Sequence, residues 1–208
     1  MGKTSAQRAA KHGDRAAQPA HIASLNAPRS PQQVKSNANL ILVAAAATTA
    51  FMFFYFHLMV LPQMTQLAQG MAMPDSLPGG YSLEYLNDLR SVMDGDALGQ
   101  LSYVHKTAGT IFPLIFGFTW LLIIGLNARG RLRRWLLWAA PILFVVVDLW
   151  ENVVIDNALG AQTLSSGDAA LAGTLTVARW VLLGLSLLAA VVAVFGRRRQ
   201  AAPEPGLG

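Results

Sequence analysis

The stretch "VVVDLWENVV", residues 145–154, places charged side chains in the middle of a long apolar segment. Five of its ten residues are valine, yet Asp148, Glu151 and Asn152 lie among them and Asp156 follows closely. The apolar residues favour a helix that crosses a lipid bilayer, whereas each carboxylate facing hydrocarbon would cost roughly 2.5–3.5 kcal/mol. The segment therefore predicts a membrane helix whose polar side chains face other helices.

The whole chain has the composition of a membrane protein with several spans. Of its 208 residues, 53% are hydrophobic and 13% are charged, whereas about a quarter are charged in a typical soluble domain. Four apolar segments reach the ~20 residues that a membrane helix requires; they cover residues 40–61, 108–126, 135–155 and 171–195. We expect an all-α fold, a four-helix transmembrane bundle within a membrane domain of residues 38–196.

The positions of the basic residues predict the orientation of this bundle. Six Lys or Arg residues precede the first span, four lie in "NARGRLRRW" between the second and third spans, and three follow the last span. The other loops contain only Arg90 and Lys106, and Arg179 lies inside the fourth span. Because Lys and Arg are enriched on the cytoplasmic side, we expect both termini to be cytoplasmic, in the cell inner or plasma membrane.

The net charge of +5 comes from the basic residues that set this orientation. The lipid bilayer is therefore the expected partner, other membrane protein subunits are further candidates, and nucleic acid is not expected. Residues 1–37 are polar and contain one acidic residue, which predicts a disordered basic cytoplasmic tail, with an organelle transit peptide as the alternative. Residues 197–208 are expected to form a second cytoplasmic tail.

The outer loop, residues 62–107, begins at Pro62, which is expected to end the first span. Within it, "SLEYLNDLRSVM" predicts a short amphipathic helix, because Ser82 suits an N-cap and apolar residues recur at helical spacing. After a break at Gly95, Asp96 is a possible N-cap for a second helix. Loops of this length usually have a function or pack over the rest of the fold, and we expect this one to cover the ends of the other helices.

The polar residues of the third span share one face. At about 100° per residue from Asp148, Glu151 falls near −60°, Asn152 near +40° and Asp156 near +80°. In the fourth span, Arg179 lies at a similar depth, roughly 25–27 Å from the cytoplasmic end. We therefore expect Arg179 to form an ion pair with Glu151 or Asp148, in the outer half of the bilayer.

Further polar side chains are expected at the same outer level. His57 lies near the end of the first span, and His105 and Lys106 precede the second. The simplest interpretation is an ion pair that holds two helices together, with histidines at the membrane interface. A ligand cavity, a proton-relay pair and a metal site are the alternatives, the last with His57, His105 and Glu151 as candidate ligands. We assign no metal site and no cofactor on this evidence.

Pro113 interrupts the backbone hydrogen bonding of the second span. A proline inside a helix leaves one carbonyl without its N–H partner and bends the helix. Membrane helices tolerate this where a neighbouring helix satisfies the freed carbonyl. We therefore expect a partner for this carbonyl in the bundle.

Four short motifs resemble a group of bacterial four-span membrane proteins. They are "PGGYSLEYLNDLRSVM" in the outer loop, the FP of "TIFPLIFG", "DLWEN" in the third span, and "ARW" in the fourth. The resemblance covers residues 78–180; the group has a GYS outer loop and a D-x-x-E-N motif, and a lysine is more usual than Arg179. It implies the four-span architecture and a site at these motifs, without a reaction.

The sequence does not decide whether the chain is an enzyme. It has no cysteine and none of the motifs HExxH, GxSxG or a glycine-rich phosphate loop. We expect a non-enzymatic accessory, assembly or small-ligand-binding component of a membrane. The alternatives are a membrane-embedded enzyme or metal-binding protein that uses the outer polar cavity, and a subunit of a proton-coupled carrier.

Overall fold

The computed structural model describes residues 31–201, and the side chains of residues 37–197. The chain divides into two units, residues 1–40 and 41–208, of which the first contributes the start of α3. Every regular element in the described part is helical. These elements are α3 (Pro31–Phe53), η2 (Phe54–Val60), α4 (Leu61–Leu67), η3 (Pro74–Ser76), α5 (Leu83–Val92), α6 (Gly95–Lys106), α7 (Ala108–Asn127), α8 (Arg131–Gly160) and α9 (Ser166–Ala201).

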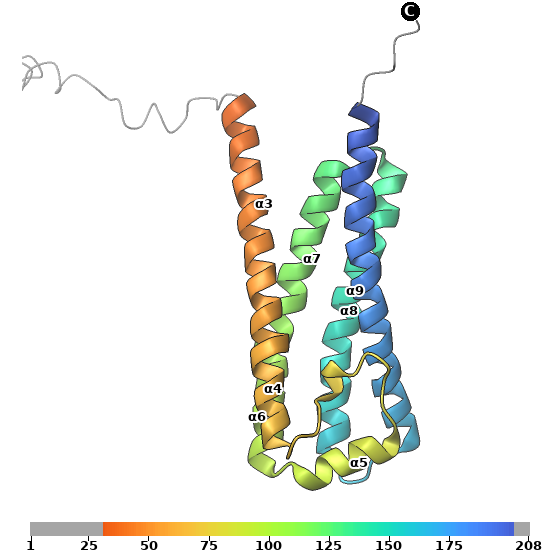
Figure 1. Cartoon of the computed structure of the whole chain (residues 1–208). Coiled ribbons are helices and arrows are strands. Elements are labelled where there is room, and N and C mark those ends of the chain that lie inside the picture. The colour runs from red at the N-terminus through yellow and green to blue at the C-terminus, as the bar shows by residue number, and fades with distance from the viewer. Residues whose placement is uncertain (1–30, 202–208) are drawn as a thin grey trace, which may run out of the picture. The chain divides into compact units, whose positions relative to one another are not determined.

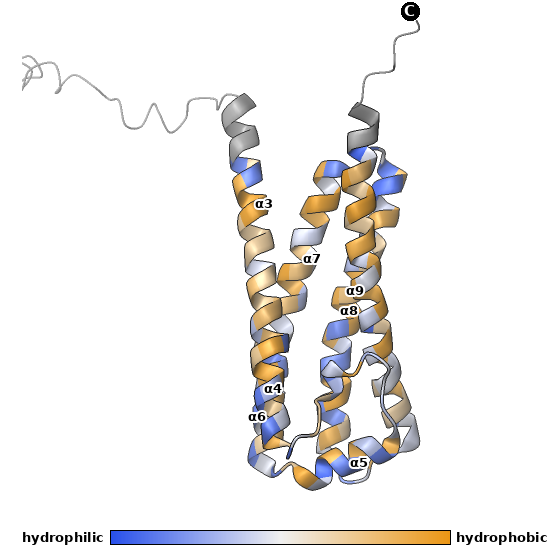
Figure 2. Ribbon diagram, in the orientation of Figure 1, coloured by the Kyte–Doolittle hydropathy of each residue, from blue (hydrophilic) through white to orange (hydrophobic). Residues whose placement is uncertain are grey.

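Four continuous helical stretches are long and apolar enough to cross a membrane. They cover Asn37–Leu67, Gly95–Asn127, Arg131–Gly160 and Ser166–Arg197. Figure 2 shows hydrophobic residues along these stretches and hydrophilic residues toward their ends. The predicted all-α fold with four candidate spans is therefore confirmed. The expected tails at 1–37 and 197–208 lie largely outside the described residues, although α3 already begins at Pro31.

The first apolar helix continues beyond the expected end at residue 61. It changes from α3 to a π-helical segment, Phe54–Val60, and then to α4, which ends at Leu67. Pro62 lies in the first turn of α4, where the absence of its N–H has little effect. The prediction that Pro62 ends the helix is wrong, because the π-helical turn places the proline at the start of a new α-helical segment.

The outer loop folds into the two expected helices. Ser82 is the N-cap of α5, and its hydroxyl accepts a hydrogen bond from Tyr85 N at 3.1 Å. For α6 the N-cap is Asp94, which accepts from Ala97 N at 2.8 Å, so the expectation of Asp96 as N-cap is wrong. The helix starts two residues earlier because glycine is tolerated in its first turn.

The loop is anchored against the long helices (Figure 1). Arg90 of α5 donates a hydrogen bond to the carbonyl of Ala161, between α8 and α9. The backbone of Tyr81 lies against Gly173 of α9, where an added Cβ would lie 3.1 Å from the Tyr81 carbonyl oxygen. The segment between α4 and α5 thus reaches the bundle and brings polar groups to it.

The long helices pack closely in the part of the chain from residue 41 onward. α8 lies along both α7 and α9. Gly117 of α7 faces Val145 of α8 so closely that an added Cβ would lie 2.4 Å from a Val145 methyl group. In α3, Thr49 is joined to Thr119 of α7 by a hydrogen bond of 2.9 Å between their hydroxyls. Aromatic side chains, including Phe112 and Phe144, fill the core.

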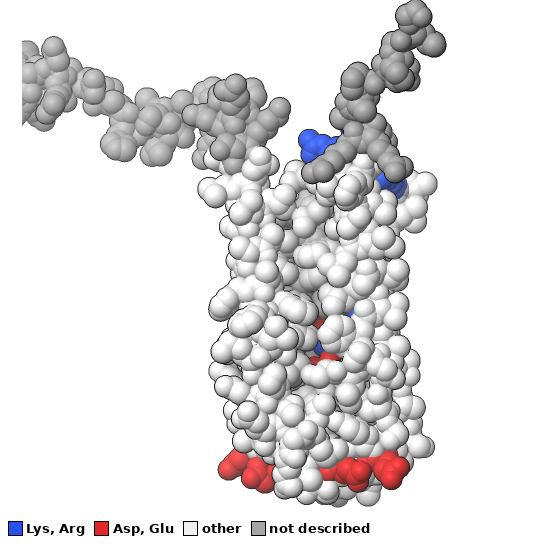
Figure 3. All heavy atoms as spheres, viewed as in Figure 1, with Lys and Arg blue, Asp and Glu red and all other residues white. Residues whose placement is uncertain are grey.

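Exposed charges separate to the two ends of the long helices (Figure 3). Asp and Glu residues gather at the end where α5 lies, among them Glu84, Asp88 and Asp94. In the same view, Lys and Arg residues appear at the opposite end. Between the two ends the visible surface carries uncharged side chains, apart from charged atoms seen inside a hollow, and such a surface suits a lipid environment.

Candidate functional site

Arg179 of α9 lies at the centre of a buried cluster of charges. Its Nε atom is 2.8 Å from Glu151 Oε2, and its Nη1 atom is 3.3 Å from Asp148 Oδ1. All three residues are at most 2% exposed. The predicted ion pair between the third and fourth spans is therefore present, and Arg179 pairs with both carboxylates.

A third carboxylate reaches Arg179 from the outer loop. Asp75 lies in η3 and is fully buried, and its Oδ1 atom is 3.7 Å from Arg179 Nη1. The Asp75 carbonyl also accepts hydrogen bonds from Arg179 and, at 3.1 Å, from Trp180 Nε1. The outer loop therefore supplies part of the cluster as well as covering it.

His105 joins this buried carboxylate to one nearer the surface. Its Nε2 atom is 3.2 Å from Asp75 Oδ2, and its Nδ1 atom is 2.6 Å from Asp156 Oδ1. His105 is 1% exposed, whereas the Asp156 side chain is 19% exposed. Ser102 also donates to Asp156, at 2.9 Å. The four residues form a continuous polar path from the partly exposed Asp156, between α6 and the end of α8, to the centre of the cluster.

Thr176 and Tyr81 extend the network on the other side of Glu151. The Thr176 hydroxyl lies 2.6 Å from Glu151 Oε1 and 3.3 Å from the Tyr81 hydroxyl oxygen. Burial raises the pKa of the Tyr81 hydroxyl, and the nearby Glu151 carboxylate adds to this effect. Tyr81 therefore remains protonated and can act as a hydrogen-bond donor or acceptor without changing the charge of the cluster.

Asn152 lies next to the charged cluster and has a structural role. Its Nδ2 atom donates a hydrogen bond of 3.0 Å to the carbonyl of Gly109. Gly109 lies four residues before Pro113 in α7, so this is the carbonyl that the proline leaves without a backbone partner. The expectation that a neighbouring helix satisfies this carbonyl is confirmed, and the partner belongs to the D-x-x-E-N motif.

Replacement of Asn152 by Leu should destabilise the protein by about 1–3 kcal/mol, because the Gly109 carbonyl would lose its buried donor. The measurement is reversible unfolding in mixed micelles. The matched control is Asn157→Leu, since Asn157 is exposed on the same helix. Equal stability of the two variants would contradict the role given to Asn152.

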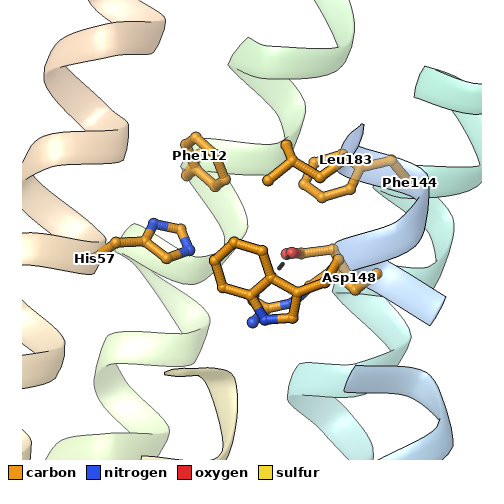
Figure 4. A pocket seen from close by; sticks show the side chains of 7 residues that line it. His57, Phe112, Phe144, Asp148 and Leu183 are labelled. Atoms are coloured by element: carbon orange, nitrogen blue, oxygen red, sulfur yellow. Dashed lines mark hydrogen bonds and ion pairs between the residues drawn. The ribbon is translucent and has the colours of Figure 1, made fainter. Parts of the chain in front are cut away.

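A pocket lies beside Asp148, between the π-helical segment of the first apolar helix and the other long helices. Figure 4 shows His57 of η2 and Asp148 of α8 pointing into it from opposite sides, near Phe112, Phe144 and Leu183. The pocket is too narrow to admit a water-sized sphere. Asp148 Oδ2 is buried and has no hydrogen-bond partner among the described residues. A polar atom of this kind usually has a partner, so it is the first place to expect a ligand.

Aromatic side chains surround His57, which makes no ion pair with the described residues. Its ring stacks on Phe53 at a centroid distance of 4.6 Å and meets the rings of Phe112 and Trp180 edge-on, at 5.1 and 5.7 Å. The π-helical segment that carries it is a rare conformation, often found at functional sites. His57 thus faces the pocket of Asp148 without being committed to another polar group of the cluster.

Lys106 does not join the cluster, and the three candidate metal ligands do not form a site. Lys106 is exposed at the end of α6, and within residues 37–197 no ion pair joins it to the cluster. His57, His105 and Glu151, the candidate metal ligands, do not form a metal-binding group. The described residues contain no set of three or more His, Asp or Glu side chains that could hold a metal ion.

The cluster contains more acidic than basic groups. Its members are four carboxylates (Asp75, Asp148, Glu151, Asp156) and two basic side chains (His105, Arg179). Even with both basic groups charged, ionisation of all four carboxylates would leave two surplus negative charges. Asp156 is partly exposed, whereas the other three carboxylates are buried in a region of low dielectric constant. Buried charges of this kind require compensation by protons or by a bound cation.

The charge of Asp75 depends on its neighbours. Burial alone would raise the pKa of Asp75, but His105, through its charge and a hydrogen bond, and the charge of Arg179 hold this pKa well below its ordinary value. Asp75 is therefore ionised at neutral pH. The protons or the cation that compensate the surplus negative charge must therefore bind at the other carboxylates of the cluster.

The wild-type protein should lose part of its free energy of unfolding in acid, because a depressed carboxyl pKa stabilises the folded state only above the unfolded pKa. The ordinary pKa of Asp75 is 3.8. The stability difference between the wild type and Asp75→Asn should be constant above about pH 5 and should shrink below about pH 4. Unfolding of both proteins in detergent across this range is the measurement. A difference that persists unchanged in acid would contradict the assignment.

Sequence reasoning missed Asp75, Thr176 and Tyr81 as members of the site. Asp75 stands in a proline- and glycine-rich loop, and its neighbours in sequence do not distinguish it from an ordinary turn residue. One signal was available: the third span carries more carboxylates than Arg179 can neutralise, so further polar partners were required. Thr176 lies one turn before Arg179, on the same side of α9, and could have been found from this spacing.

Comparison of the chain with models of protein families, with curated proteins and with solved structures finds no match. The geometry and charges of the cluster are therefore the basis for assigning a function.

Proposed function

We propose that the chain is a multi-pass protein of the cell inner or plasma membrane that binds a small cationic ligand at Asp148. The surplus of negative charge in the buried cluster carries this proposal. An ion pair that only joins two helices needs one carboxylate for one cation, whereas Arg179 faces three carboxylates. Within residues 37–197, Asp148 Oδ2 has no hydrogen-bond partner, and it lies beside the pocket that His57 also lines.

The separation of exposed charge supports the orientation proposed with this function. Acidic side chains gather at the α5 end of the long helices, and basic side chains appear at the opposite end (Figure 3). Since Lys and Arg are enriched on the cytoplasmic side, the basic end is cytoplasmic and the cluster lies in the outer half of the bilayer. Both termini are then cytoplasmic as well.

The same cluster supports membership of the group of bacterial four-span proteins that the motifs resemble. Tyr81 of the GYS loop, the D-x-x-E-N residues of α8, and Arg179 with Trp180 of α9 belong to one network of contacts. Pro113 of the FP motif creates the free carbonyl that Asn152 binds. Motifs that lie far apart in the sequence thus serve one site, as a shared function would require.

The test is to identify small molecules that co-purify with the protein in lipid nanodiscs. The wild type and Asp96→Asn should carry the same amine or other cationic species, because Asp96 is exposed at the start of α6. Asp148→Asn should lose this species, since it removes the negative charge that the ligand would neutralise. Equal amounts on all three proteins, or an absence of cationic species from the wild type, would refute the proposal.

A second candidate function is proton transfer, as part of a proton-coupled carrier. The observation that favours it is the bridge from the partly exposed Asp156 through His105 to the buried Asp75. Asp156 borders a cavity of about 250 Å³ near the ends of α6 and α8. Under a pH gradient, the interior of proteoliposomes that contain the wild type would then acidify faster than the interior of those that contain His105→Gln. Equal rates would exclude this function.

A further inference from the structure

A lateral groove lies on the face between the first apolar helix and helices α7 and α9. It has a cavity volume of about 370 Å³, within the range of small-molecule sites. Its lining is formed by small residues of α3, aromatic residues of α7 and leucines of α9. Figure 3 shows a hollow in the uncharged surface of the molecule, with charged atoms visible inside it. The groove thus faces the region that the bilayer would occupy.

The groove adjoins the pocket beside Asp148. Phe112 of α7 and Leu183 of α9 line both spaces. From Phe112 the groove extends along α7 to Ile123, eleven residues further on, which is about 16 Å along a helix. An apolar chain in the groove would therefore point one end at Asp148 and the other toward the cytoplasmic half of the bundle.

We propose that the ligand is a membrane-dissolved amphiphile whose amine head binds Asp148 and whose apolar chain lies in this groove. The inference rests on the proposed binding of a cation at Asp148, and adds the class of ligand and its route of entry. The ligand enters sideways from the lipid, because the groove opens between α3 and α9 within the apolar length of both helices.

The charges around the pocket favour a cationic head group over an anionic one. Arg179 already faces three carboxylates, so an anionic head would add to a negative surplus instead of relieving it. A protonated amine at Asp148 Oδ2 would give this oxygen a hydrogen bond and reduce the surplus by one charge. The apolar lining of the groove in turn disfavours a polar tail, whose buried groups would lack partners.

Entry of the head group requires a side-chain movement. The pocket beside Asp148 is closed to a water-sized sphere, and the His57 and Trp180 rings border it. His57 belongs to the π-helical segment Phe54–Val60, which interrupts the regular hydrogen bonding between α3 and α4. Phe112 and Leu183 line both spaces, so displacement of these side chains would open the pocket toward the groove without breaking an ion pair of the cluster.

Binding of radiolabelled dodecylamine to the protein in phosphatidylcholine nanodiscs tests the proposal, with empty nanodiscs as background. Ala50 lines the groove, and Ala50→Phe should fill it and lower the affinity at least tenfold. Ala47 lies on the same helix outside the groove lining, so Ala47→Phe is the matched control. Asp148→Asn should also lower the affinity at least tenfold, and dodecanoate should bind at least tenfold more weakly than the amine. If Ala50→Phe fails to fold, Ala46→Phe replaces it.

The outcomes separate the two proposals. Loss of affinity in Asp148→Asn but not in Ala50→Phe would overturn the groove and leave the cation site intact. Loss in Ala50→Phe but not in Asp148→Asn would overturn the amine head at Asp148, and with it the proposed function. Binding no greater than that of empty nanodiscs would overturn the amphiphilic ligand and leave the cation site to the co-purification test. Equal binding of dodecanoate would overturn the selection of a cationic head group.

Discussion

Arg179→Gln is expected to destabilise the protein by about 3–5 kcal/mol, because it leaves buried carboxylates without their counter-charge. Three carboxylates lie within 3.7 Å of the Arg179 guanidinium nitrogens. Removal of this charge would leave Asp75, Asp148 and Glu151 buried without the cation that they share. Equilibrium unfolding in mixed micelles, together with the amount of folded protein in the membrane, measures the effect.

Two further variants define the cause of this loss. Arg131→Gln is the matched control, since Arg131 is exposed at the start of α8, and it should change stability by no more than about 0.5 kcal/mol. Adding Asp148→Asn and Glu151→Gln to Arg179→Gln should recover much of the lost stability, so the effects should be strongly non-additive. Additive losses would show that the three residues act independently.

His105→Leu is expected to have the second largest effect, about 3 kcal/mol, because His105 is buried between two carboxylates. The variant would also free the loop that carries Asp75, since one of the contacts that hold η3 would be lost. Hydrogen exchange should therefore rise in residues 71–80 before it rises in α8. His57→Leu is the control, because His57 is held by aromatic rings and makes no ion pair with the described residues.

An unchanged exchange rate in residues 71–80 of His105→Leu would contradict this account. So would an equal rise in His57→Leu. Recovery of stability on adding Asp75→Asn to His105→Leu would identify the unpaired Asp75 carboxylate as the cause of the loss.

Much of the bundle could be predicted because membrane helices are constrained by simple physics. A segment that crosses the hydrocarbon core of a bilayer must form a continuous helix of about 20 apolar residues. The four spans could therefore be located from the apolar residues in the sequence. Helical periodicity then placed Asp148 and Glu151 on one face, and depth placed Arg179 opposite them. The ion pairs could be predicted because a carboxylate and an arginine are both unfavourable in lipid, and because these residues lie at the same depth.

The outer loop could not be predicted in the same way. The burial of Asp75 depends on how the segment between α4 and α5 folds back, and loops follow no periodic pattern that shows their path. The π-helical turn before Pro62 was equally hidden, because a proline usually marks the end of a helix. Both features lie where the chain departs from regular structure, and both bring residues to the cluster.

The balance of charge in the cluster was not predicted. The sequence showed a carboxylate surplus in the third span, but it did not show which further groups would join the cluster. Asp75 adds a negative charge and His105 offers a positive one. The surplus that supports a ligand site therefore emerged only when residues from three separate segments were placed together.

The free energy of unfolding of Asp148→Asn, measured without ligand, tests the central claim most directly. If the cluster carries surplus negative charge that a cationic ligand normally neutralises, this variant should be at least as stable as the wild type. Its amide oxygen can still accept a hydrogen bond from Arg179, which keeps Glu151 and Asp75 as partners. A loss of about 1–3 kcal/mol, as expected when a needed buried partner is removed, would contradict the claim and show that Asp148 serves only to join α8 to α9.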